Sequence, residues 1–424
     1  MKYQSKSKPV LDNIVNDHNE TFKQKRKFIV RLGKMLHKYG IPAYRLESHL
    51  MELADAIELR SSFIISPTSM TFVLWTEGHE DEYTHAARVA PGDLDMGSLS
   101  RTDEVVSDVI SNTLTIDEAL ERLDEIETMP SRNGRAITGL SYVLASGAFA
   151  MLMRSSLNDV LWAGLLGGIV YIFVLWSERS KGITNMLEPL VAMVSAFAAC
   201  GIAVHYDASI SIRLVILSSI IVFIPGLALT IGLAELSARH LVSGTVKIMD
   251  AFMMLFKLYF GAFLGMELGF AVFGHSEYVA LPPLPQWTVW LAIATLCTSL
   301  IIAFRTRRKH MFWSMAAGFI AYASSSIGAS YFDFGVGAFF GAFVIGVYGN
   351  LFTRFAKAPA VIVVMQGLIV LVPGSKTFIS LNTYIAGEGF AYAEHAGQQA
   401  VVIFMSIVAG LIFANSALPP KKSL

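Results

Sequence analysis

The chain has 424 residues, of which 54% are hydrophobic and 16% are charged, and its formal net charge is zero. With a mean hydropathy of +0.53, this composition excludes an ordinary soluble globular protein and indicates a membrane protein. Residues 1–135 carry 17 basic and 22 acidic side chains, whereas residues 136–424 carry 16 and 11. The zero charge is therefore a cancellation between two parts, and it gives no sign of nucleic-acid binding.

Residues 1–135 predict a cytoplasmic α+β domain. Two helices with one apolar face each precede a run of short β-rich stretches and a closing helix. The expected elements cover residues 22–39, 42–59, 61–66, 70–75, 83–90 and 115–129. The closing helix has a defined start, because Thr115 and Glu118 have the spacing of a capping box.

Ten stretches after residue 135 are apolar enough to cross a membrane, which takes about 20 helical residues for ~30 Å of hydrocarbon. The expected spans are 136–153, 159–176, 186–204, 213–236, 250–273, 287–304, 311–329, 335–353, 359–381 and 398–418. With the first domain in the cytoplasm, the inside segments carry 14 Lys and Arg residues and the outside segments carry Arg154 and Arg213. This asymmetry predicts a multi-pass protein of the cytoplasmic (inner) membrane with both termini cytoplasmic.

The ten spans divide into two halves of five, residues 136–273 and 287–418. The strings "IVFIPGLALTIGL" and "IVLVPGSKTFISL" occur one in each half, and Pro373 of the second lies 148 residues after Pro225 of the first. Five spans per half make the second half enter the membrane the other way up. The predicted fold class is a polytopic α-helical membrane protein, a 5+5 inverted-repeat ten-span bundle with an N-terminal cytoplasmic α+β domain.

The two Pro-Gly pairs predict helix breaks near mid-membrane. Proline cannot donate a backbone hydrogen bond, so Pro225 is expected to free the carbonyl of Ile221, and Pro373 acts in the same way. Gly226 and Gly374 let the backbone bend without a side-chain clash. A plain proline kink is the alternative, but a pair matched by pseudo-symmetry favours one shared binding site between two broken helices.

The ligand-binding residues expected at these breaks combine the Pro-Gly pairs with nearby polar side chains. They are Pro225, Gly226, Gln366, Pro373, Gly374, Ser375 and Lys376. Lys376 lies three residues beyond the second break and is the best single charge for a substrate carboxylate. The alternative for Lys376 is a side chain that reaches outward to the water interface.

Ionisable residues inside spans are costly and therefore mark functional positions. The expected proton-coupling residues are Glu235, Asp250, Lys257 and Glu267. Asp250 and Lys257 are seven residues apart on one helix face and are expected to pair through an intermediate group. Glu235 and Asp250 lie near the inner ends of their spans, where solvation is the alternative.

No cofactor, metal site or catalytic residue is expected, so the chain is not predicted to be an enzyme. Cys200 and Cys297 are expected to be small apolar packing residues, since neither has metal-ligand spacing. The string "GHEDEYTH" at residues 78–85 is better explained by a charged hairpin tip than by a metal site. No P-loop, nucleophile elbow or HExxH motif is present in the sequence.

The chain resembles the threonine/serine exporter family in four strings. These are "GIPAYRLESHL", "SPTSMTFV", "FIPGLALTIGLAELSARHLVSGTVKIMDA" and "LVPGS", which lie in both parts of the chain. The resemblance covers nearly the whole chain. It implies a fused protein, with a soluble N-terminal domain plus ten spans, that exports small amino acids by means of the proton motive force.

The partners implied by this reading are a small-molecule substrate, protons and the lipid bilayer, with a homo-oligomer as a possible assembly. The resemblance leaves three alternatives. A split version of the family implies a dicarboxylate such as succinate as cargo. A membrane-anchored sensor or enzyme would place the activity in the N-terminal domain. A channel is the third, although paired breaks suit a binding site better than a continuous pore.

Overall fold

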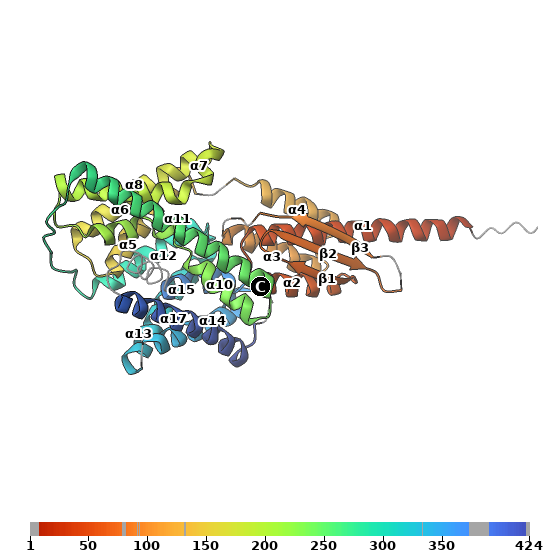
Figure 1. Ribbon diagram of the computed structural model, residues 1–424. Helices are drawn as coiled ribbons and strands as arrows, with labels where there is room; N and C mark the ends of the chain where they lie inside the picture. Colours follow the sequence, from red (N-terminus) through yellow and green to blue (C-terminus); the bar gives the residue numbers. More distant parts are fainter. Residues whose placement is uncertain are drawn as a thin grey trace, which may run out of the picture. The chain divides into compact units, whose positions relative to one another are not determined.

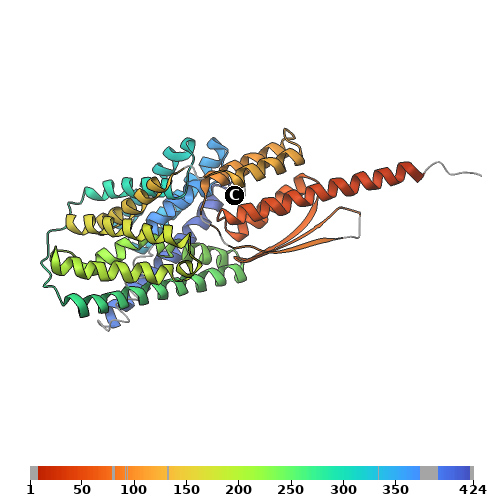
Figure 2. The ribbon, with the colours of Figure 1, turned by 90° about the horizontal axis from the view of Figure 1, so that it is seen from above.

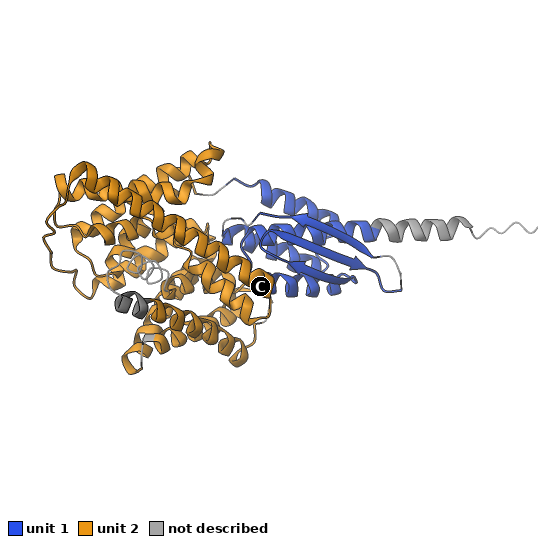
Figure 3. Cartoon of the chain, in the orientation of Figure 1, with its two compact units in different colours: residues 1–130, 422–424 blue, residues 131–421 orange. Residues whose placement is uncertain are grey.

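The protein is described from a computed structural model, shown in Figure 1. The described residues are 8–78, 82–90, 92, 94–130, 133–332, 334–372 and 390–420. The chain divides into two compact units, residues 1–130 with 422–424 and residues 131–421 (Figure 3). Most described residues are helical, and the strands belong to the first unit.

The first unit is an α+β fold, as predicted. Its elements are α1 (Lys8–Lys38), α2 (Ala43–Ala56), β1 (Arg60–Ile65), β2 (Ser69–Trp75), β3 (Tyr83–Arg88), α3 (Met96–Ile110) and α4 (Ile116–Thr128). The strands form an antiparallel sheet in the order β1-β2-β3, in which Phe63 pairs with Phe72 and Phe72 with His85. The α3 helix was not predicted, since its sequence "MGSLSRTDEVVSDVI" mixes apolar and polar residues without a clean stripe.

The apolar faces predicted for the first two helices form the core of this unit. Leu32 and Leu36 of α1, Leu50 of α2 and Phe72 of β2 are fully buried. Alternation along β2 points its apolar side chains to one face, where α1 packs against them, and α2 packs against the neighbouring strand β1. The Thr115 capping box is confirmed, because Thr115 accepts from the Glu118 amide and Glu118 accepts from the Thr115 amide.

The second unit is a helical bundle. Its helices are α5 (Arg135–Leu152), α6 (Leu157–Ser177), α7 (Lys181–Asn185), α8 (Leu187–His205), α9 (Ile212–Ser219), the 3-10 turn η1 (Ile221–Phe223), α10 (Gly226–Ser237), α11 (Leu241–Phe273), α12 (Thr288–Ala303), α13 (Arg308–Tyr331), α14 (Phe334–Ala356), α15 (Val361–Leu371) and α17 (Phe390–Ala417). Each predicted span overlaps one of these helices or the broken pair α9 and α10, and the part of the ninth span after residue 372 lies outside the described residues.

Within the described residues, six of these helices are long and apolar enough to cross a membrane. The bent pair α9 and α10 makes a seventh if it is counted as one span. The shorter apolar helices α12 and α15 have 16 and 11 residues, fewer than the roughly 20 that a straight span needs. Six or seven candidate spans among the described residues thus indicate a multi-pass membrane protein, and the number of ten spans stays a prediction. The fifth span also begins nine residues earlier than predicted, at Leu241.

The helices of the two halves have matching neighbours. In the first half α5 packs against α6 and α9, α6 against α8 and α9, and α8 against α9 and α11. In the second half α12 packs against α13 and α15, α13 against α14 and α15, and α14 against α15 and α17. Figure 2 shows the helices of the first half running side by side. The order of packing in the first half is thus repeated in the second.

The crossing of the first two helices is repeated in atomic detail. A Cβ added to Gly167 of α6 would lie 2.2 Å from Ser146 Oγ of α5. A Cβ added to Gly318 of α13 would lie 2.1 Å from Cys297 Sγ of α12. The second pair of residues lies 151 positions after the first. In each half a glycine therefore lets a small side chain of the neighbouring helix approach closely.

A second glycine contact joins the third and fifth helices. A Cβ on Gly261 of α11 would lie 2.2 Å from the Pro189 carbonyl oxygen of α8, and one on Gly265 would lie 2.2 Å from that of Met193. In the second half, a Cβ on Gly410 of α17 would lie 2.6 Å from the carbonyl oxygen of Phe339 on α14. Gly261 and Gly265 thus form a close-packing stripe on α11.

We expect Gly265→Ala to destabilise the bundle by about 1–3 kcal/mol, because the new methyl group meets backbone that can move only with the whole α8 helix. Gly182→Ala is the matched control, since its Cβ would meet only Ser180 Oγ at 3.8 Å. Thermal unfolding of the purified full chain in detergent measures the stability of both variants. Equal melting temperatures for the two variants would show that α8 and α11 are not closely packed.

Candidate functional site

The first Pro-Gly pair breaks a helix, as predicted. The α9 helix ends at Ser219, the η1 turn follows, and α10 begins at Gly226 with a bend of 55°. Pro225 and Gly226 are both buried. The break therefore lies inside the bundle, where lipid does not reach the irregular backbone.

The expected consequence for the Ile221 carbonyl is wrong. Its oxygen accepts from the Ile224 amide at 3.1 Å, because the chain tightens into the 3-10 turn before the proline. The Gly226 amide in turn donates to the Ile224 oxygen at 2.8 Å. One turn earlier, the oxygen of Ser219 accepts from Ser146 Oγ of α5 at 3.3 Å. Local turns and a neighbouring hydroxyl thus provide hydrogen bonds for the backbone carbonyl groups near the break.

The second Pro-Gly pair follows directly on α15. That helix ends at Leu371, and the Val372 amide closes its last turn by donating to Leu368. The predicted ligand-binding residues beyond this point lie outside the described residues. They are Pro373, Gly374, Ser375 and Lys376.

The residues that flank the first break and the residue that precedes the second Pro-Gly pair belong to one packed region. Ile224, Ala228 and Val372 pack against the same buried apolar cluster, which includes Leu229 of α10 and Phe404 of α17. The α10 helix also packs directly against α15 and α17 of the second half. The helix that follows the first break and the helix that precedes the second are therefore neighbours.

Gln366, predicted as a ligand-binding residue, is fully buried in α15. Its Nε2 donates to the backbone oxygen of Cys297 on α12 at 2.9 Å. Its Oε1 has no hydrogen-bond partner among the described residues. An amide oxygen without a partner is unusual at such depth, because burying an unpaired polar group is costly.

Ser218 of α9 is a polar residue that the sequence analysis did not single out. It is fully buried, and its hydroxyl has no hydrogen-bond partner among the described residues. The sequence contained a signal for it, since Ser218 precedes Pro225 by seven residues and Gln366 precedes Pro373 by the same number. The repeat offset of 148 therefore matches Ser218 with Gln366.

Glu235 is fully buried, so its interpretation as a solvated residue is wrong. One carboxylate oxygen forms an ion pair with Lys247 Nζ of α11, and the other accepts from Ser243 Oγ at 2.7 Å. The α10 and α11 helices approach closely at this point because Gly244 has no side chain. A Cβ on Gly244 would lie 2.7 Å from the Gly232 carbonyl oxygen. Glu235 therefore joins the helix that starts at the first break, α10, to α11.

The other predicted proton-coupling residues lie on α11. Asp250 and Glu267 are exposed on the surface of the described bundle. Lys257 Nζ lies 3.7 Å from Glu188 Oε2 in the first turn of α8. The ion pair of Lys257 is thus formed with Glu188 and not with Asp250 as predicted, because α8 and α11 pack side by side while residues seven apart are about 10 Å apart along a helix.

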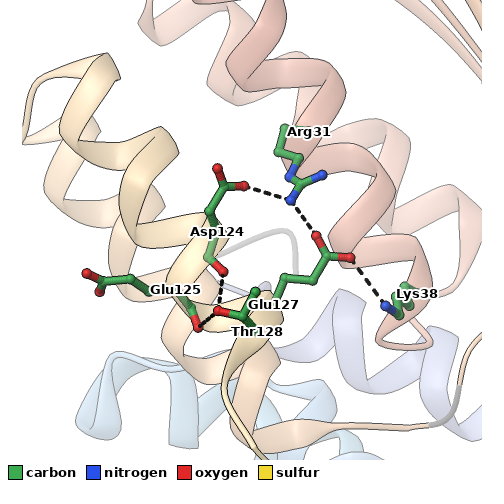
Figure 4. A network of polar contacts seen from close by, with 6 residues as sticks. All are labelled: Arg31, Lys38, Asp124, Glu125, Glu127 and Thr128. Atoms are coloured by element: carbon green, nitrogen blue, oxygen red, sulfur yellow. Dashed lines mark hydrogen bonds and ion pairs between the residues drawn. The ribbon is translucent and has the colours of Figure 1, made fainter.

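The first unit offers a polar network rather than a reactive site (Figure 4). Arg31 of α1 lies between Asp124 and Glu127 of α4, at 2.7 and 2.5 Å, and Lys38 lies 3.3 Å from Glu127. These side chains are mostly half-exposed, and they hold α1 against α4. Nearby, burial and the charge of Asp95 raise the pKa of Tyr39 to about 12, so its hydroxyl stays protonated at neutral pH.

In the described parts of the chain, no group of three His, Cys, Asp or Glu side chains is placed to hold a metal ion. Part of the "GHEDEYTH" segment, residues 79–81, lies outside the described residues. Cys200 and Cys297 are both buried and free, and a Cβ on Gly269 would lie 2.6 Å from the Cys200 Cβ. Both cysteines thus lie at close helix contacts.

Known proteins resemble the chain along most of its length. "Pheromone-regulated membrane protein 10" of Debaryomyces hansenii is 25% identical over 381 residues, which covers 86% of this chain and 37% of that protein. The proteins of the same name from Candida albicans and Eremothecium gossypii are 26% and 24% identical, over 86% and 82% of this chain and 34% and 48% of theirs. The chain thus spans about a third to a half of these curated relatives.

No solved structure matches the chain. Two family models match it in succession along the sequence. A threonine/serine exporter model matches residues 27–269, and a second, described as "Threonine/Serine exporter, ThrE", matches residues 287–417. Together they cover most of the first unit, most of the helical bundle and both Pro-Gly pairs. The chain therefore belongs to the threonine/serine exporter family.

Proposed function

We propose that the chain is a secondary exporter of small amino acids of the threonine/serine type across the cytoplasmic membrane, driven by the proton motive force. The observation that carries the proposal is the buried helix break at Pro225 and Gly226, whose outgoing helix α10 packs against α15, the helix that leads into the second Pro-Gly pair. The membership of the family supports the same function.

The proposed mechanism is alternating access between two inverted halves of five spans each. Matching helix neighbours in the two halves support this arrangement, as do the glycine crossings at Gly167 and Gly318. In such transporters two broken helices meet at one central site, and one half rocks against the other. The first unit lies on the cytoplasmic side in this proposal, with both termini inside.

The proposed cargo site combines the two breaks with the polar groups beside them. The start of α10 at Gly226 brings the positive end of a helix dipole to the first break. Lys376 supplies a positive charge after the second. Gly374 and Ser375 provide flexible backbone and a hydroxyl between them. Pro373 and these residues are placed in the site from the sequence repeat alone.

A dicarboxylate exporter is the second candidate, because a lysine three residues after the second break suits a cargo with an additional carboxylate. A sensor or enzyme based in the first unit has less support, since its charged network holds two helices together and half of its side chains face solvent. The transport of radiolabelled threonine, serine and succinate by the full chain in proteoliposomes, with and without a proton gradient, tests all three. Accumulation of the amino acids in response to the gradient is expected.

The proposed proton path uses the ionisable residues of α10 and α11. A proton that crosses ~150 mV releases roughly 3.5 kcal/mol, enough for a few hundred-fold gradient of cargo. Glu235 is the strongest candidate, because it is a fully buried carboxylate on the helix that begins at the break and its ion pair with Lys247 bridges two helices. Protonation of Glu235 would release Lys247 and free α10 to move.

We expect Glu235→Gln to slow proton-driven transport while exchange of internal for external cargo stays measurable, because the amide keeps the shape but carries no titrating proton. Asp250→Asn and Glu267→Gln test the other two carboxylates in the same assay. Transport at the wild-type rate in all three variants would remove these carboxylates from the mechanism.

Lys247→Met provides a separate test of the buried pair. It removes the cation of the Glu235–Lys247 ion pair, so we expect a loss of thermal stability, which the double variant Glu235→Gln, Lys247→Met restores in large part. Thermal unfolding of the four proteins in detergent gives the coupling between the two residues. A simple sum of the two single effects would contradict the pairing.

We expect Lys376→Met to weaken cargo binding by about 10- to 150-fold, the equivalent of one charge-assisted hydrogen bond of about 1.5–3 kcal/mol. Titration of purified protein with threonine and with succinate measures the change. If Lys376 instead reaches the outer water interface, the affinity for both compounds stays as in the wild type, and the residue has no part in the site.

A further inference from the structure

Two buried polar side chains occupy equivalent positions in the two halves. Ser218 and Gln366 are both fully buried, lie 148 residues apart and each precede a Pro-Gly pair by seven residues. Each has a side-chain oxygen without a hydrogen-bond partner among the described residues. The repeat therefore places a matched, unsatisfied polar group beside each break.

The surroundings of the two residues match as well. Ser146 of α5 donates to the backbone oxygen of Ser219, next to Ser218. In the second half, the backbone oxygen of Cys297 on α12 accepts from Gln366. Ser146 and Cys297 are themselves equivalent, since each fills the gap beside a glycine at the same helix crossing. Both polar groups thus lie beside the first helix of their own half.

These two first helices pack against each other. The Ser299 hydroxyl of α12 donates to the Ser141 oxygen of α5 at 2.8 Å, and the contact is buried. The α5 and α12 helices therefore form a direct interface between the halves.

The hydrogen bond of Gln366 determines which of its atoms remains open. A backbone carbonyl only accepts hydrogen bonds, so the side-chain atom that faces the Cys297 oxygen must be the NH₂ group. The open atom is therefore the amide oxygen, which is an acceptor. A group with a hydrogen to donate, such as an ammonium, a hydroxyl or a water molecule, satisfies it, whereas the neighbouring Cys297 thiol is only a weak donor. An ionised carboxylate does not.

We propose that Gln366 is a specificity-determining contact for the cargo, with Ser218 as its counterpart in the first half, and that its open oxygen accepts from the cargo's ammonium group. The inference rests on the proposed function and deepens it. Buried acceptors of this kind discriminate strongly, because a compound without the donor leaves the acceptor desolvated and unpaired. The site then favours an amino acid over a dicarboxylate, which has no donor at neutral pH.

The test measures binding rather than transport, by calorimetric titration of the purified full chain with threonine, N-acetyl-threonine and succinate. We expect wild type to bind threonine better than its acetylated form, which lacks the ammonium. Gln366→Met, which keeps the length of the side chain, should weaken threonine binding by about 10- to 150-fold and remove most of this preference. Ser218→Ala removes one neutral hydrogen bond, so a loss of about 2- to 13-fold is expected.

Two further variants separate a contact from a structural role. Gln366→Glu keeps an acceptor oxygen and should retain threonine binding, whereas a purely structural amide would tolerate methionine better than a buried carboxylate. Thr102→Val is the matched control, since Thr102 of α3 is also fully buried with an open hydroxyl but belongs to the first unit, outside the helical bundle. Its affinity for threonine should stay unchanged.

Unchanged threonine affinity in Gln366→Met, or an equal loss for threonine and N-acetyl-threonine, would overturn the inference and show that a water molecule satisfies the amide. The proposed function would survive that result if wild type still exports threonine. A wild-type protein that binds succinate and no amino acid would overturn the inference and the proposed cargo together.

Discussion

The structure depends on one constraint, which is that a helix interrupted inside an apolar bundle must find partners for its polar groups within the protein. The chain breaks at Pro225, and the groups around the break are satisfied by a 3-10 turn and by the Ser146 hydroxyl. Such a break is tolerated because Pro225 and Gly226 are buried in protein rather than exposed to lipid. Among the buried polar groups without a hydrogen-bond partner in the described residues, Ser218 and Gln366 are the two that each lie seven residues before a Pro-Gly pair.

Small residues make this arrangement possible, because helices in a membrane gain little from the hydrophobic effect and must pack by shape. Gly167 and Gly318 let α6 and α13 approach α5 and α12, and Gly261 and Gly265 bring α11 onto the backbone of α8. The α10 helix is held in a different way, by the buried ion pair of Glu235 with Lys247. An ion pair responds to protonation and a glycine contact does not. The proposed proton-coupling step therefore involves the contact between α10 and α11 at Glu235 and Lys247.

Patterns that act over a few residues were predicted well from the sequence. The apolar faces of α1 and α2, the Thr115 capping box and the break at Pro225 all follow from local spacing or from the chemistry of one residue type. The partners of polar groups were not predictable in this way. Lys247 lies 12 residues from Glu235, and Glu188 lies 69 residues from Lys257, so only the packing of α8, α10 and α11 pairs them. The hydrogen bonding of the Ile221 carbonyl was predicted wrongly, because the chain forms a 3-10 turn before the proline and the Ile224 amide donates to that carbonyl.

The central claim is that the cargo binds where the two broken helices meet. A cryo-electron microscopy map of the full chain with bound threonine tests it most directly. The account predicts density for the amino acid between the Pro225–Gly226 and Pro373–Gly374 breaks, with the ammonium facing the amide oxygen of Gln366. Threonine density in the first unit, or anywhere in the bundle away from both breaks, would contradict the account.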